Sequence, residues 1–323
     1  RVLAGERRPE GPFGDHYGYN SLRHDYPVFR VDRVFRRKDA VLPATVVGRP
    51  RQEDFYIGDY LQELLSPLFP VVMPSVLDLW SYGETGFHSL AAARVKHRYP
   101  REALASGLRI LGEGQLSLTK CLILTDQPVS LRDFSAVLES FLERVDFQSD
   151  VVVLGQTAMD TLDYTGPMVN RGSKAILMGL GEPRRSLPTQ FDGSLPSGIE
   201  AARPYCRGCL VLQGRPYAEY EAQAADVARH PAFVDWPLLV LVDDLEEATR
   251  SDELFLWTVF TRFEPAGDLH ARTEHLDRFH VSLEAPMVFD ARMRPSYPEV
   301  MEVDEATREL VDKRWDAYGI RLP

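Results

Sequence analysis

Two carboxylates lie close together near the start of the chain, in the string Glu10-Gly11-Pro12-Phe13-Gly14-Asp15-His16. A rigid proline bracketed by glycines allows both side chains to turn toward one point. A neighbouring charge can then move the two carboxyl pKa values apart, so Glu10 and Asp15 are candidates for a proton donor and its orienting partner. The same residue types also suit a tight turn beside a strand, with Asp as the turn cap. On residue types alone, the turn is the preferred interpretation.

Three further residues have side chains suited to chemistry. Glu84 and His88 are four apart, a spacing that pairs residues on one helix face. The strand-like Val76–Trp80 and the glycines after it predict a strand and a loop instead, so capping or a subunit contact is preferred for this pair. Lys120 opens a predicted strand and could reach a phosphate or carboxylate. We expect a solvated strand-end lysine in preference to that role.

Two pairs in the second half of the chain suggest metal or redox chemistry. Asp243 and Asp244 follow the predicted strand Leu238–Val242 and could bind a cation, but a structural role is preferred. Cys206 and Cys209 form a CxxC, although no second pair completes the four ligands of a structural zinc site. We expect two thiols at a turn that enters a strand.

Histidines and glycines elsewhere do not form a recognisable site. His270, His275 and His280 are five apart, which suits neither one helix face nor alternating strand positions. Gly155 and the stretch Gly179–Gly181 do not form a GxGxxG between a strand and a helix. Metal binding at these histidines and a nicotinamide enzyme are therefore disfavoured.

The composition is that of an ordinary globular chain, with 323 residues, 44% hydrophobic content and a formal net charge of -11. At roughly 150 residues per domain it has room for about two domains. Phosphate binding needs a basic surface, so no nucleic-acid partner is expected. The apolar stretches are shorter than the roughly 20 residues that span a bilayer, and no stable membrane insertion is expected. Three cysteines are too few for a disulfide framework and fit a cytoplasmic location.

Strand and helix patterns must position these residues. The β-branched runs Val28–Val34 and Ala40–Val47 flank a charged turn and predict a hairpin, the last strands of a β-domain. Helical spacing then predicts a linking helix over Asp59–Leu68. From Val71 onward strand-like and helix-like stretches alternate, which favours an α/β layer with a largely parallel sheet. The predicted elements are strands 75–79, 121–125 and 151–154 and helices 99–111 and 131–144.

The α/β pattern occurs twice. Cys121–Asp150 matches Leu238–Asp268 in order: an apolar strand, an acidic turn, an amphipathic helix and a final Asp. The match continues where MDTLDYTGPMV, residues 159–169, resembles EHLDRFHVSLEAPMV, residues 274–288. We expect a duplication with the same strand order in both copies. The Pro-, Gly- and Ser-rich stretch Glu182–Pro204 is expected to link them.

Three segments together resemble the UbiD decarboxylase family: EGPFGDHYGY, then PVFRVDRVFRRKDAVLPATVVGRPRQED, then TKCLILTDQPVSLRDF. GETGFHSLAAARVKHRYPREAL and RILGEGQLSLTK resemble the branch that acts on a dihydroxynaphthoate in menaquinone synthesis. The resemblance implies prenylated FMN as the cofactor and Mn²⁺ as the metal. It also implies that Asp15 is the proton donor and Glu10 its orienting partner, and that His16 and Phe55 line the substrate pocket. The flavin and Mn²⁺ ligands of the family lie upstream of the motif, so we expect an upstream portion to be missing.

The resemblance also implies an architecture and partners. We expect an α/β fold with an α+β start: residues 1–50 as the tail of a split flavin-binding β-barrel, and 51–70 as the linking helix. Residues 71–200 would form the first α/β unit, and 201–323 the second with a C-terminal helix. We expect a homodimer or larger oligomer, partly through an apolar stripe on Glu305–Tyr318, and a flavin prenyltransferase as cofactor supplier. The implied activity is reversible, non-oxidative decarboxylation of a small aromatic carboxylate. The alternative is an assembly module without a complete cofactor site.

Overall fold

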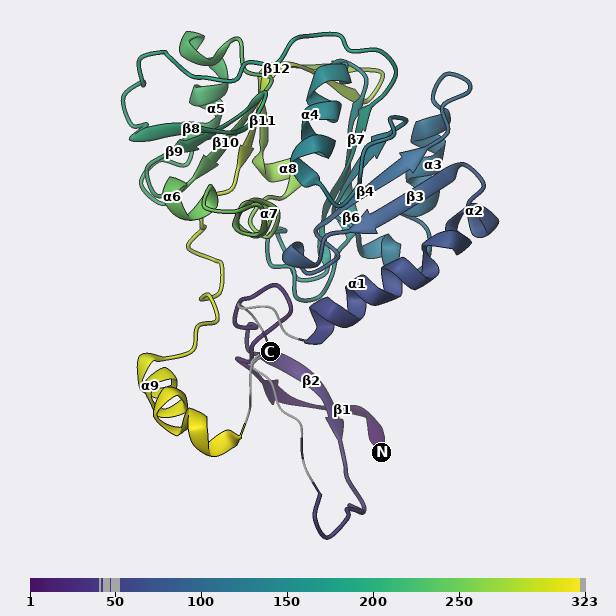
Figure 1. Cartoon of the computed structure of the whole chain (residues 1–323), viewed down its shortest axis with the longest axis vertical. Coiled ribbons are helices and arrows are strands. Elements are labelled where there is room, and N and C mark those ends of the chain that lie inside the picture. Colours follow the sequence, from purple (N-terminus) through teal and green to yellow (C-terminus); the bar gives the residue numbers. More distant parts are fainter. Residues whose placement is uncertain (41, 43–46, 48–52, 320–323) are drawn as a thin grey trace. The chain divides into compact units, whose positions relative to one another are not determined.

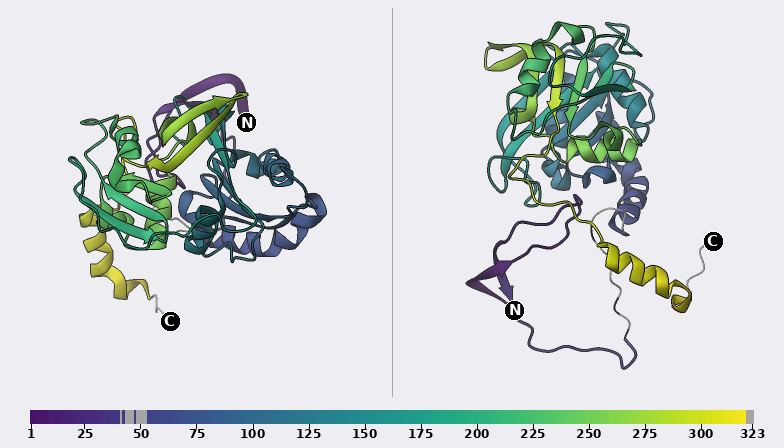
Figure 2. Two further views of the ribbon diagram at one scale, coloured as in Figure 1. Left: turned by 90° about the horizontal axis from the view of Figure 1, so that it is seen from above. Right: turned by 90° about the vertical axis from the view of Figure 1, so that its left-hand side faces the viewer.

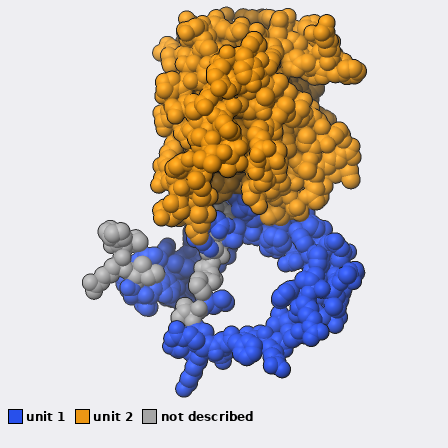
Figure 3. Space-filling model, turned by 90° about the vertical axis from the view of Figure 1, so that its right-hand side faces the viewer, with its two compact units in different colours: residues 1–54, 298–323 blue, residues 55–297 orange. Residues whose placement is uncertain are grey.

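A computed structural model describes residues 1–40, 42, 47 and 53–319 (Figures 1 and 2). The chain divides into two compact units (Figure 3). We call Arg1–Asp54 with Pro298–Pro323 the motif unit, and Phe55–Tyr297 the sheet unit. Within the described residues, no helix combines the length and apolar composition that a membrane span requires.

The motif unit is built on an antiparallel ribbon of β1 (Val2–Glu10) and β2 (His24–Phe29). The sequence pattern predicted that Val28–Val34 would pair with Ala40–Val47. In the structure β2 ends at Phe29 and pairs with β1 instead. Most of the other predicted strand, Ala40–Val47, lies outside the described residues. The sequence pattern missed β1 because Gly, Pro and charged residues replace apolar alternation in VLAGERRPE.

The C-terminal segment belongs to the motif unit. An isolated bridge pairs Val300 with Tyr19, and two backbone hydrogen bonds flank it. Asp304 then caps helix α9 (Glu305–Arg314), which continues as the 3₁₀ turn η5 (Trp315–Tyr318). The tail helix was expected in the second α/β unit, but it groups with the first 54 residues.

The linking helix runs as α1 (Glu53–Leu65), the 3₁₀ turn η1 (Ser66–Leu68) and α2 (Phe69–Val72). It begins six residues before the predicted start at Asp59. The Gln62 side chain forms hydrogen bonds with both the backbone N–H and C=O of Ser81. These bonds attach α1 to the edge strand β3, whose outer backbone groups would otherwise have no partner strand.

The first sheet has the strand order β3-β4-β5-β7-β6. Strands β4, β5 and β7 are parallel, and the outer strands β3 and β6 pair with them antiparallel. The sheet is therefore mixed rather than largely parallel, because the connections from β3 to β4 and from β6 to β7 contain no crossover α-helix. Its elements, together the first copy, are β3 (Val76–Ser81), the 3₁₀ turn η2 (Gly83–Thr85), β4 (Leu90–Val95), α3 (Glu102–Ile110), the 3₁₀ turn η3 (Gly114–Leu118), β5 (Cys121–Thr125), α4 (Phe134–Arg144), β6 (Val151–Ala158) and β7 (Arg171–Gly179).

The second sheet has the order β8-β9-β10-β12-β11, with parallel and antiparallel pairings in the same places as in the first. Both sheets therefore have the common strand order that the sequence match predicts, and the duplication itself stays a hypothesis. The elements of this second copy are β8 (Ala201–Cys206), β9 (Cys209–Gln213), α5 (Gln223–Arg229), the 3₁₀ turn η4 (Pro231–Phe233), β10 (Leu238–Val242), α6 (Leu245–Ala248), α7 (Asp252–Phe260), α8 (Pro265–Asp268), β11 (Leu269–Asp277) and β12 (His280–Asp290).

Strand register gives the equivalent positions of the two copies. Cys121 pairs with Ala175 in the first sheet, and Leu238 pairs with Met287 in the second. The alignment of MDTLDYTGPMV with EHLDRFHVSLEAPMV is therefore wrong, because residues 159–169 lie in the loop after β6 whereas 274–288 form β11 and β12. The two segments share a Pro-Met-Val string, which lies in a loop in the first copy and in strand β12 in the second.

Helices cover both faces of both sheets (Figure 1). Buried side chains of α4 and α7, including Phe141 and Phe260, form one core with both sheets. Ile110 of α3 belongs to a second core on the other face of the first sheet, and Val227 of α5 to a third on the other face of the second sheet. The sheet unit thus has helical and β layers in alternation, a mixed α/β fold.

Candidate functional site

Asp15 lies in a tight turn of the motif unit and is only 2% exposed. Its carboxylate accepts hydrogen bonds from the backbone N–H groups of Tyr17, at 2.8 Å, and Tyr19, at 3.3 Å. The Asp15 N–H donates to the Tyr19 carbonyl at 2.9 Å, which closes the turn. A carboxylate held by backbone amides keeps one orientation, as a positioned proton donor requires. The structure thus shows the turn that the residue types favour, and the proton-donor role of Asp15 stays a prediction.

The C-terminal segment fixes this turn, which the sequence did not predict. The Asn20 N–H donates to the Glu299 carbonyl at 2.8 Å, and the Met301 N–H donates to the Gly18 carbonyl at 2.9 Å. An added Cβ at Gly14 would lie 2.5 Å from the Val47 backbone carbonyl oxygen and 2.7 Å from the Met301 Cε. Glycine at this position is therefore needed for the close approach. A pairing across so many residues has no local sequence signal.

Glu10 is the last residue of β1, where it pairs with His24 of β2 and is exposed. The His24 Nε2 and the Tyr26 hydroxyl are 2.7 Å apart. Burial first, and then the negative charge of Glu10, raise the pKa of Tyr26. Glu10 therefore acts electrostatically on its ribbon neighbours.

The two predicted pocket residues fall in different units. His16 follows Asp15 in the turn, with its ring 4.3 Å from that of Tyr17. Phe55 is buried in the sheet unit, where an added Cβ on Gly83 would lie 2.7 Å from its ring and the Phe87 ring is 6.4 Å away. Phe55 thus packs α1 against the loop that follows β3.

Buried charges gather in the first copy where its three parallel strands begin, which we call the amino edge. Lys120 is 1% exposed, and its Nζ lies 2.8 Å from an Asp163 carboxylate oxygen and 3.2 Å from the Thr165 hydroxyl. The expectation of a solvated lysine is wrong, because the loop after β6 covers it. Lys174, on the adjacent strand, donates to the Thr119 carbonyl at 2.8 Å. Burial lowers the pKa of Lys174 to about 8.

The same loop supplies a partner for His88. The His88 Nδ1 is 2.5 Å from the Asp160 Oδ2, and the Leu162 N–H donates to the Asp160 Oδ1 at 2.9 Å. His88 and Glu84 lie in the loop between β3 and β4, as predicted, and not on one helix face. Asp160 and Asp163 were not predicted as site residues. Their only sequence signal is a pair of acids between two strands.

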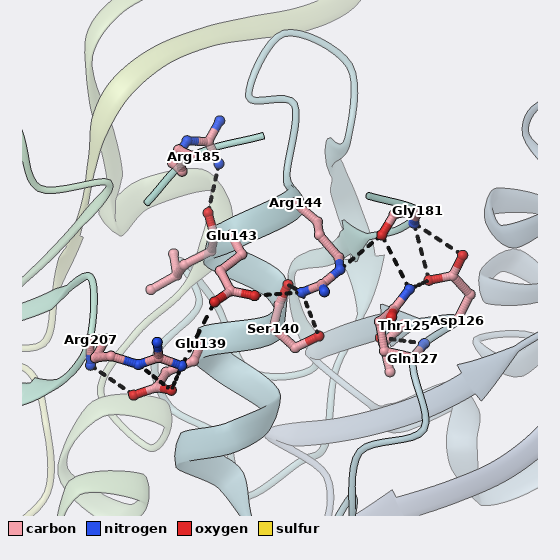
Figure 4. Close-up of polar contacts among 11 residues, drawn as sticks. Thr125, Asp126, Gln127, Glu139, Ser140, Glu143, Arg144, Gly181, Arg185 and Arg207 are labelled. Atoms are coloured by element: carbon pink, nitrogen blue, oxygen red, sulfur yellow. Dashed lines mark hydrogen bonds and ion pairs between the residues drawn. The ribbon is translucent and has the colours of Figure 1, made fainter. Parts of the chain in front are cut away.

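The opposite, carboxyl edge of the first sheet carries a second polar network (Figure 4). The Asp126 carboxylate accepts from the Gly181 N–H at 3.0 Å, and the Arg144 Nε donates to the Gly181 carbonyl at 2.9 Å. The Arg207 guanidinium binds Glu139 at 2.7 Å, which joins α4 to the turn between β8 and β9. These contacts hold chain segments together, so we assign the network a structural role.

The paired residues of the second copy also have structural partners. The Met293 N–H donates to Asp243 at 2.7 Å, and Asp244 caps helix α6. Cys206 and Cys209 pair across the tight turn that leads into β9, which agrees with the expected turn. Burial raises the pKa of Cys209 and so disfavours a reactive thiolate.

Two descriptions of one protein family match the chain. The 3-octaprenyl-4-hydroxybenzoate carboxy-lyase Rift-related domain matches residues 1–50, and the C-terminal domain of the same carboxy-lyase matches residues 55–179. The chain belongs to the UbiD family. The matches include the Asp15 turn and the amino edge of the first copy, and they end where β7 ends. The second copy lies outside both of these UbiD matches.

Curated relatives extend the similarity to nearly the whole chain. An uncharacterised protein of Chlamydia trachomatis is 54% identical over 320 residues, which are 98% of this chain and 54% of that protein. A Chlamydia pneumoniae protein that is named as a subunit of 4-hydroxybenzoate decarboxylase is 54% identical over 315 residues, 98% of this chain and 53% of that protein. The chain thus spans about half the length of these relatives.

A solved decarboxylase structure has the same fold. The closed form of vanillic acid decarboxylase from Sedimentibacter hydroxybenzoicus is similar with a TM-score of 0.52 and 19% identity, over 71% of this chain and 45% of that one. At this identity the similarity shows the fold alone, and it agrees with the α/β class predicted from the sequence.

Proposed function

We propose that the complete protein catalyses the reversible, non-oxidative decarboxylation of an aromatic carboxylic acid. The observation that carries this proposal is a UbiD family match that includes a buried, backbone-oriented Asp15. The name of the Chlamydia pneumoniae relative supports a hydroxylated aromatic acid as the substrate class. The resemblance to the menaquinone branch favours a dihydroxynaphthoate in quinone biosynthesis.

The cofactor of this reaction would be prenylated FMN, with Mn²⁺ as the metal. The flavin supplies an electron sink when carbon dioxide leaves. In the family the groups that hold both lie ahead of the EGPFGD string, so we assign no flavin or metal ligand among residues 1–323. The residue that this chain would contribute to the reaction is the proposed proton donor, Asp15.

Within the site, Asp15 would donate the proton that replaces carbon dioxide. Its 2% exposure and its bonds from the Tyr17 and Tyr19 backbone support this role, because they keep bulk water away and fix the carboxyl group. Glu10 would orient the donor, and His16 and Phe55 would line the pocket. The packing of Phe55 beside Gly83 gives that part of the wall a fixed position.

The test is Asp15→Asn in the complete polypeptide, loaded with prenylated FMN. The substitution keeps the shape and removes the transferable proton, so turnover should fall at least about a hundredfold while flavin binding stays near normal. Glu10→Gln should cause a smaller loss. Asp25→Asn, on exposed β2, is a matched control that should change neither. Near-normal turnover and normal exchange of substrate hydrogen with deuterated solvent in Asp15→Asn would contradict the proton-donor role.

Partners follow from the same proposal. We propose a homodimer or larger oligomer in the cytoplasm, with a flavin prenyltransferase as the supplier of the cofactor. Leu310, Val311 and Trp315 of the tail helix, 37–45% exposed, support self-association. A monomer in light scattering at micromolar concentration would contradict it.

The exposed face of α1 favours a second candidate, an assembly module without a complete cofactor site. Large apolar side chains that protrude from one helix are typical of an interaction surface. These residues, between 44% and 65% exposed, are Tyr56, Ile57, Tyr60, Leu61, Leu64 and Leu65. The ultraviolet-visible spectrum after co-expression with a flavin prenyltransferase separates the two: a bound flavin supports the enzyme, and its absence supports the module.

A further inference from the structure

Two thiols lie opposite each other at the hairpin that opens the second sheet. Cys206 is the last residue of β8 and Cys209 the first of β9, and the strand register pairs them directly. Opposite residues of an antiparallel pair have Cα atoms about 4.5–5.5 Å apart, within the range of about 4.4–6.8 Å that a disulfide bridges. A hydrogen bond also joins the two thiols. The backbone therefore holds the sulfur atoms where a bond between them can form.

Neighbouring segments hold the two turn residues between the thiols. The Arg207 backbone N–H and its guanidinium donate to the Glu139 carboxylate on α4, at 2.9 and 2.7 Å. The Gly208 N–H donates to the Pro188 carbonyl at 2.9 Å, and its φ angle of 81° lies in the left-handed region that glycine adopts without strain. These contacts anchor the turn in the conformation that brings the two sulfur atoms together.

Burial does not explain why a cysteine stands at position 209. Strand register makes Leu90 of the first copy its equivalent, because Leu90 pairs with the first residue of β5 and Cys209 with the first residue of β10. Leu90 and Cys209 are both 0% exposed. A leucine thus fills the same place in a sheet of the same strand order, and a buried cysteine packs as a small apolar residue. The apolar core alone therefore does not require a thiol at this position.

The two thiols differ in exposure, which sets the order in which they can react. Cys206 is half-buried, so a small molecule from solution can reach its sulfur. Cys209 is 0% exposed, and burial raises the pKa of its thiol. It is shielded from a reagent in solution, and the sulfur within its reach is the one opposite. Proximity of this kind speeds an exchange that a high thiol pKa would otherwise slow.

We infer that Cys206 and Cys209 form a thiol–disulfide exchange site for a low-molecular-weight disulfide such as oxidised glutathione. The Cys206 thiolate attacks the reagent and forms a mixed disulfide, and one reduced thiol leaves. The Cys209 thiol then gives up its proton and attacks the Cys206 sulfur, which expels the second thiol. Two protons and two electrons pass from the cysteine pair to the reagent, which leaves as two thiols. A reversible disulfide of this kind fits the cytoplasmic location proposed above.

The first experiment treats the complete protein with oxidised glutathione, blocks the remaining thiols after an acid quench and maps tryptic peptides by mass spectrometry. Trypsin cleaves after Arg207, so the two cysteines fall in separate peptides, residues 186–207 and 208–229. The expected result is one disulfide-linked species of these peptides that a reductant separates, with the buried Cys121 recovered as a free thiol. Free thiols in both peptides, or glutathione on Cys206 without a link, would overturn the inference.

Three variants test the order of the two steps. Cys209→Ala should leave Cys206 with one bound glutathione, because no second thiol displaces it. Cys206→Ser should leave Cys209 unmodified, because its 0% exposed sulfur is out of reach of the reagent. Cys121→Ala, at the third cysteine of the sequence, is the matched control and should keep the linked species. Glutathione on Cys209 in the Cys206→Ser variant would contradict the assigned order.

The dependence on glutathione concentration gives a readout that a role in packing alone would not move. At a fixed ratio of oxidised to reduced glutathione, diluting both tenfold should raise the ratio of linked to reduced protein about tenfold, because each link releases two reduced molecules. A mixed disulfide, which releases one, would show no change. A modified fraction that does not respond to dilution therefore overturns the inference. This measurement does not use decarboxylation, so its outcome is independent of the proposed function.

Discussion

The two copies of the sheet unit differ most at their amino edges. Where the first copy buries Lys120 and Lys174, the second has Pro237 and Pro286. In both copies the residue before the central strand accepts the same kind of bond: the Ala175 N–H donates to Lys120, and the Met287 N–H donates to Pro237. The backbone is therefore unchanged while the side chains differ in charge.

This difference distinguishes the features that the fold requires, which both copies share, from the charged residues that only the first copy has. Strand order, parallel pairing and the covering helices recur in both copies and follow from burial of apolar faces. The long loop with Asp160 and Asp163 occurs only in the first copy, the copy that matches the family. The comparison predicts that the paired charges of Lys120 and Asp163 can be replaced together but not singly.

The largest effect is expected when one partner of the buried pair is removed. Asp163→Asn should lower the free energy of unfolding by about 3–5 kcal/mol, because Lys120 keeps its charge at 1% exposure. The double variant Lys120→Met/Asp163→Leu should come within about 1 kcal/mol of the parent, as an apolar replacement of a buried pair often does. Urea unfolding of the complete protein measures both.

Glu63→Gln is the control for that prediction. It breaks a pair with Arg132 whose side chains are 52% and 55% exposed, so the cost should stay below about 1 kcal/mol. A double variant as unstable as Asp163→Asn would show that the first copy needs these charges to fold.

A smaller effect is expected at the carboxyl edges, where both copies have an aspartate after the central strand. Asp126 accepts from the Gly181 N–H, and Asp243 accepts from the Met293 N–H and lies 3.6 Å from Arg262, whose side chain is 8% exposed. Asp126→Ala should cost about 1–1.5 kcal/mol, and Asp243→Ala about 2–3 kcal/mol because a buried cation loses a counter-charge. Thermal unfolding compares the two, and the reverse ranking would refute this account.

The central strands of both copies could be predicted from sequence to the residue. Cys121–Thr125 and Leu238–Val242 are short, largely apolar runs next to an acidic turn, and their length is that of a buried strand. The ribbon strand β1 and the return of Glu299–Met301 to the Asp15 turn could not. Their pairing depends on partners far along the chain.

The site shows the same limit. The EGPFGD string is local, so the turn at Asp15 could be predicted from glycine, proline and aspartate alone. The partners of His88 and Lys120 could not, because Asp160 and Asp163 lie across the sheet and approach only once β6 and β7 have paired. An incorrect alignment of that loop with strands of the second copy hid them further.

Lys174, which the second copy replaces with Pro286, should make the free energy of unfolding depend on pH. The expected effect is about 1 kcal/mol. Burial lowers the pKa of Lys174 to about 8, whereas an unfolded lysine has a pKa of about 10.4. Between these values the unfolded chain binds more protons, so the free energy of unfolding rises with pH. Burial also raises the pKa of Cys121 to about 12, which changes the free energy of unfolding with pH in the opposite direction. The Lys174 variant and its parent should therefore both carry Cys121→Ala.

In the Cys121→Ala background, Lys174→Met should be more stable than its parent at pH 7.5. The difference in the free energy of unfolding should be smaller at pH 9.5, and urea midpoints at the two pH values measure this gap. Pro286 shows that the position accepts an uncharged residue in the second copy. A gap that is the same at both pH values would mean that Lys174 is not deprotonated in the folded protein.

The smallest effect is expected at the hairpin that replaces the long loop in the second copy. Arg278 and Phe279, between β11 and β12, have φ angles of 48° and 65°, a left-handed conformation that Asn and Gly adopt with less strain. Phe279 is 97% exposed, so its removal loses little packing. Arg278→Asn/Phe279→Gly should therefore raise the free energy of unfolding by about 0.5 kcal/mol and leave turnover in the proposed decarboxylation unchanged, which differential scanning calorimetry and turnover measurements together test. Loss of turnover would mean that the second copy contributes to the site, and the division of roles between the copies would then be wrong.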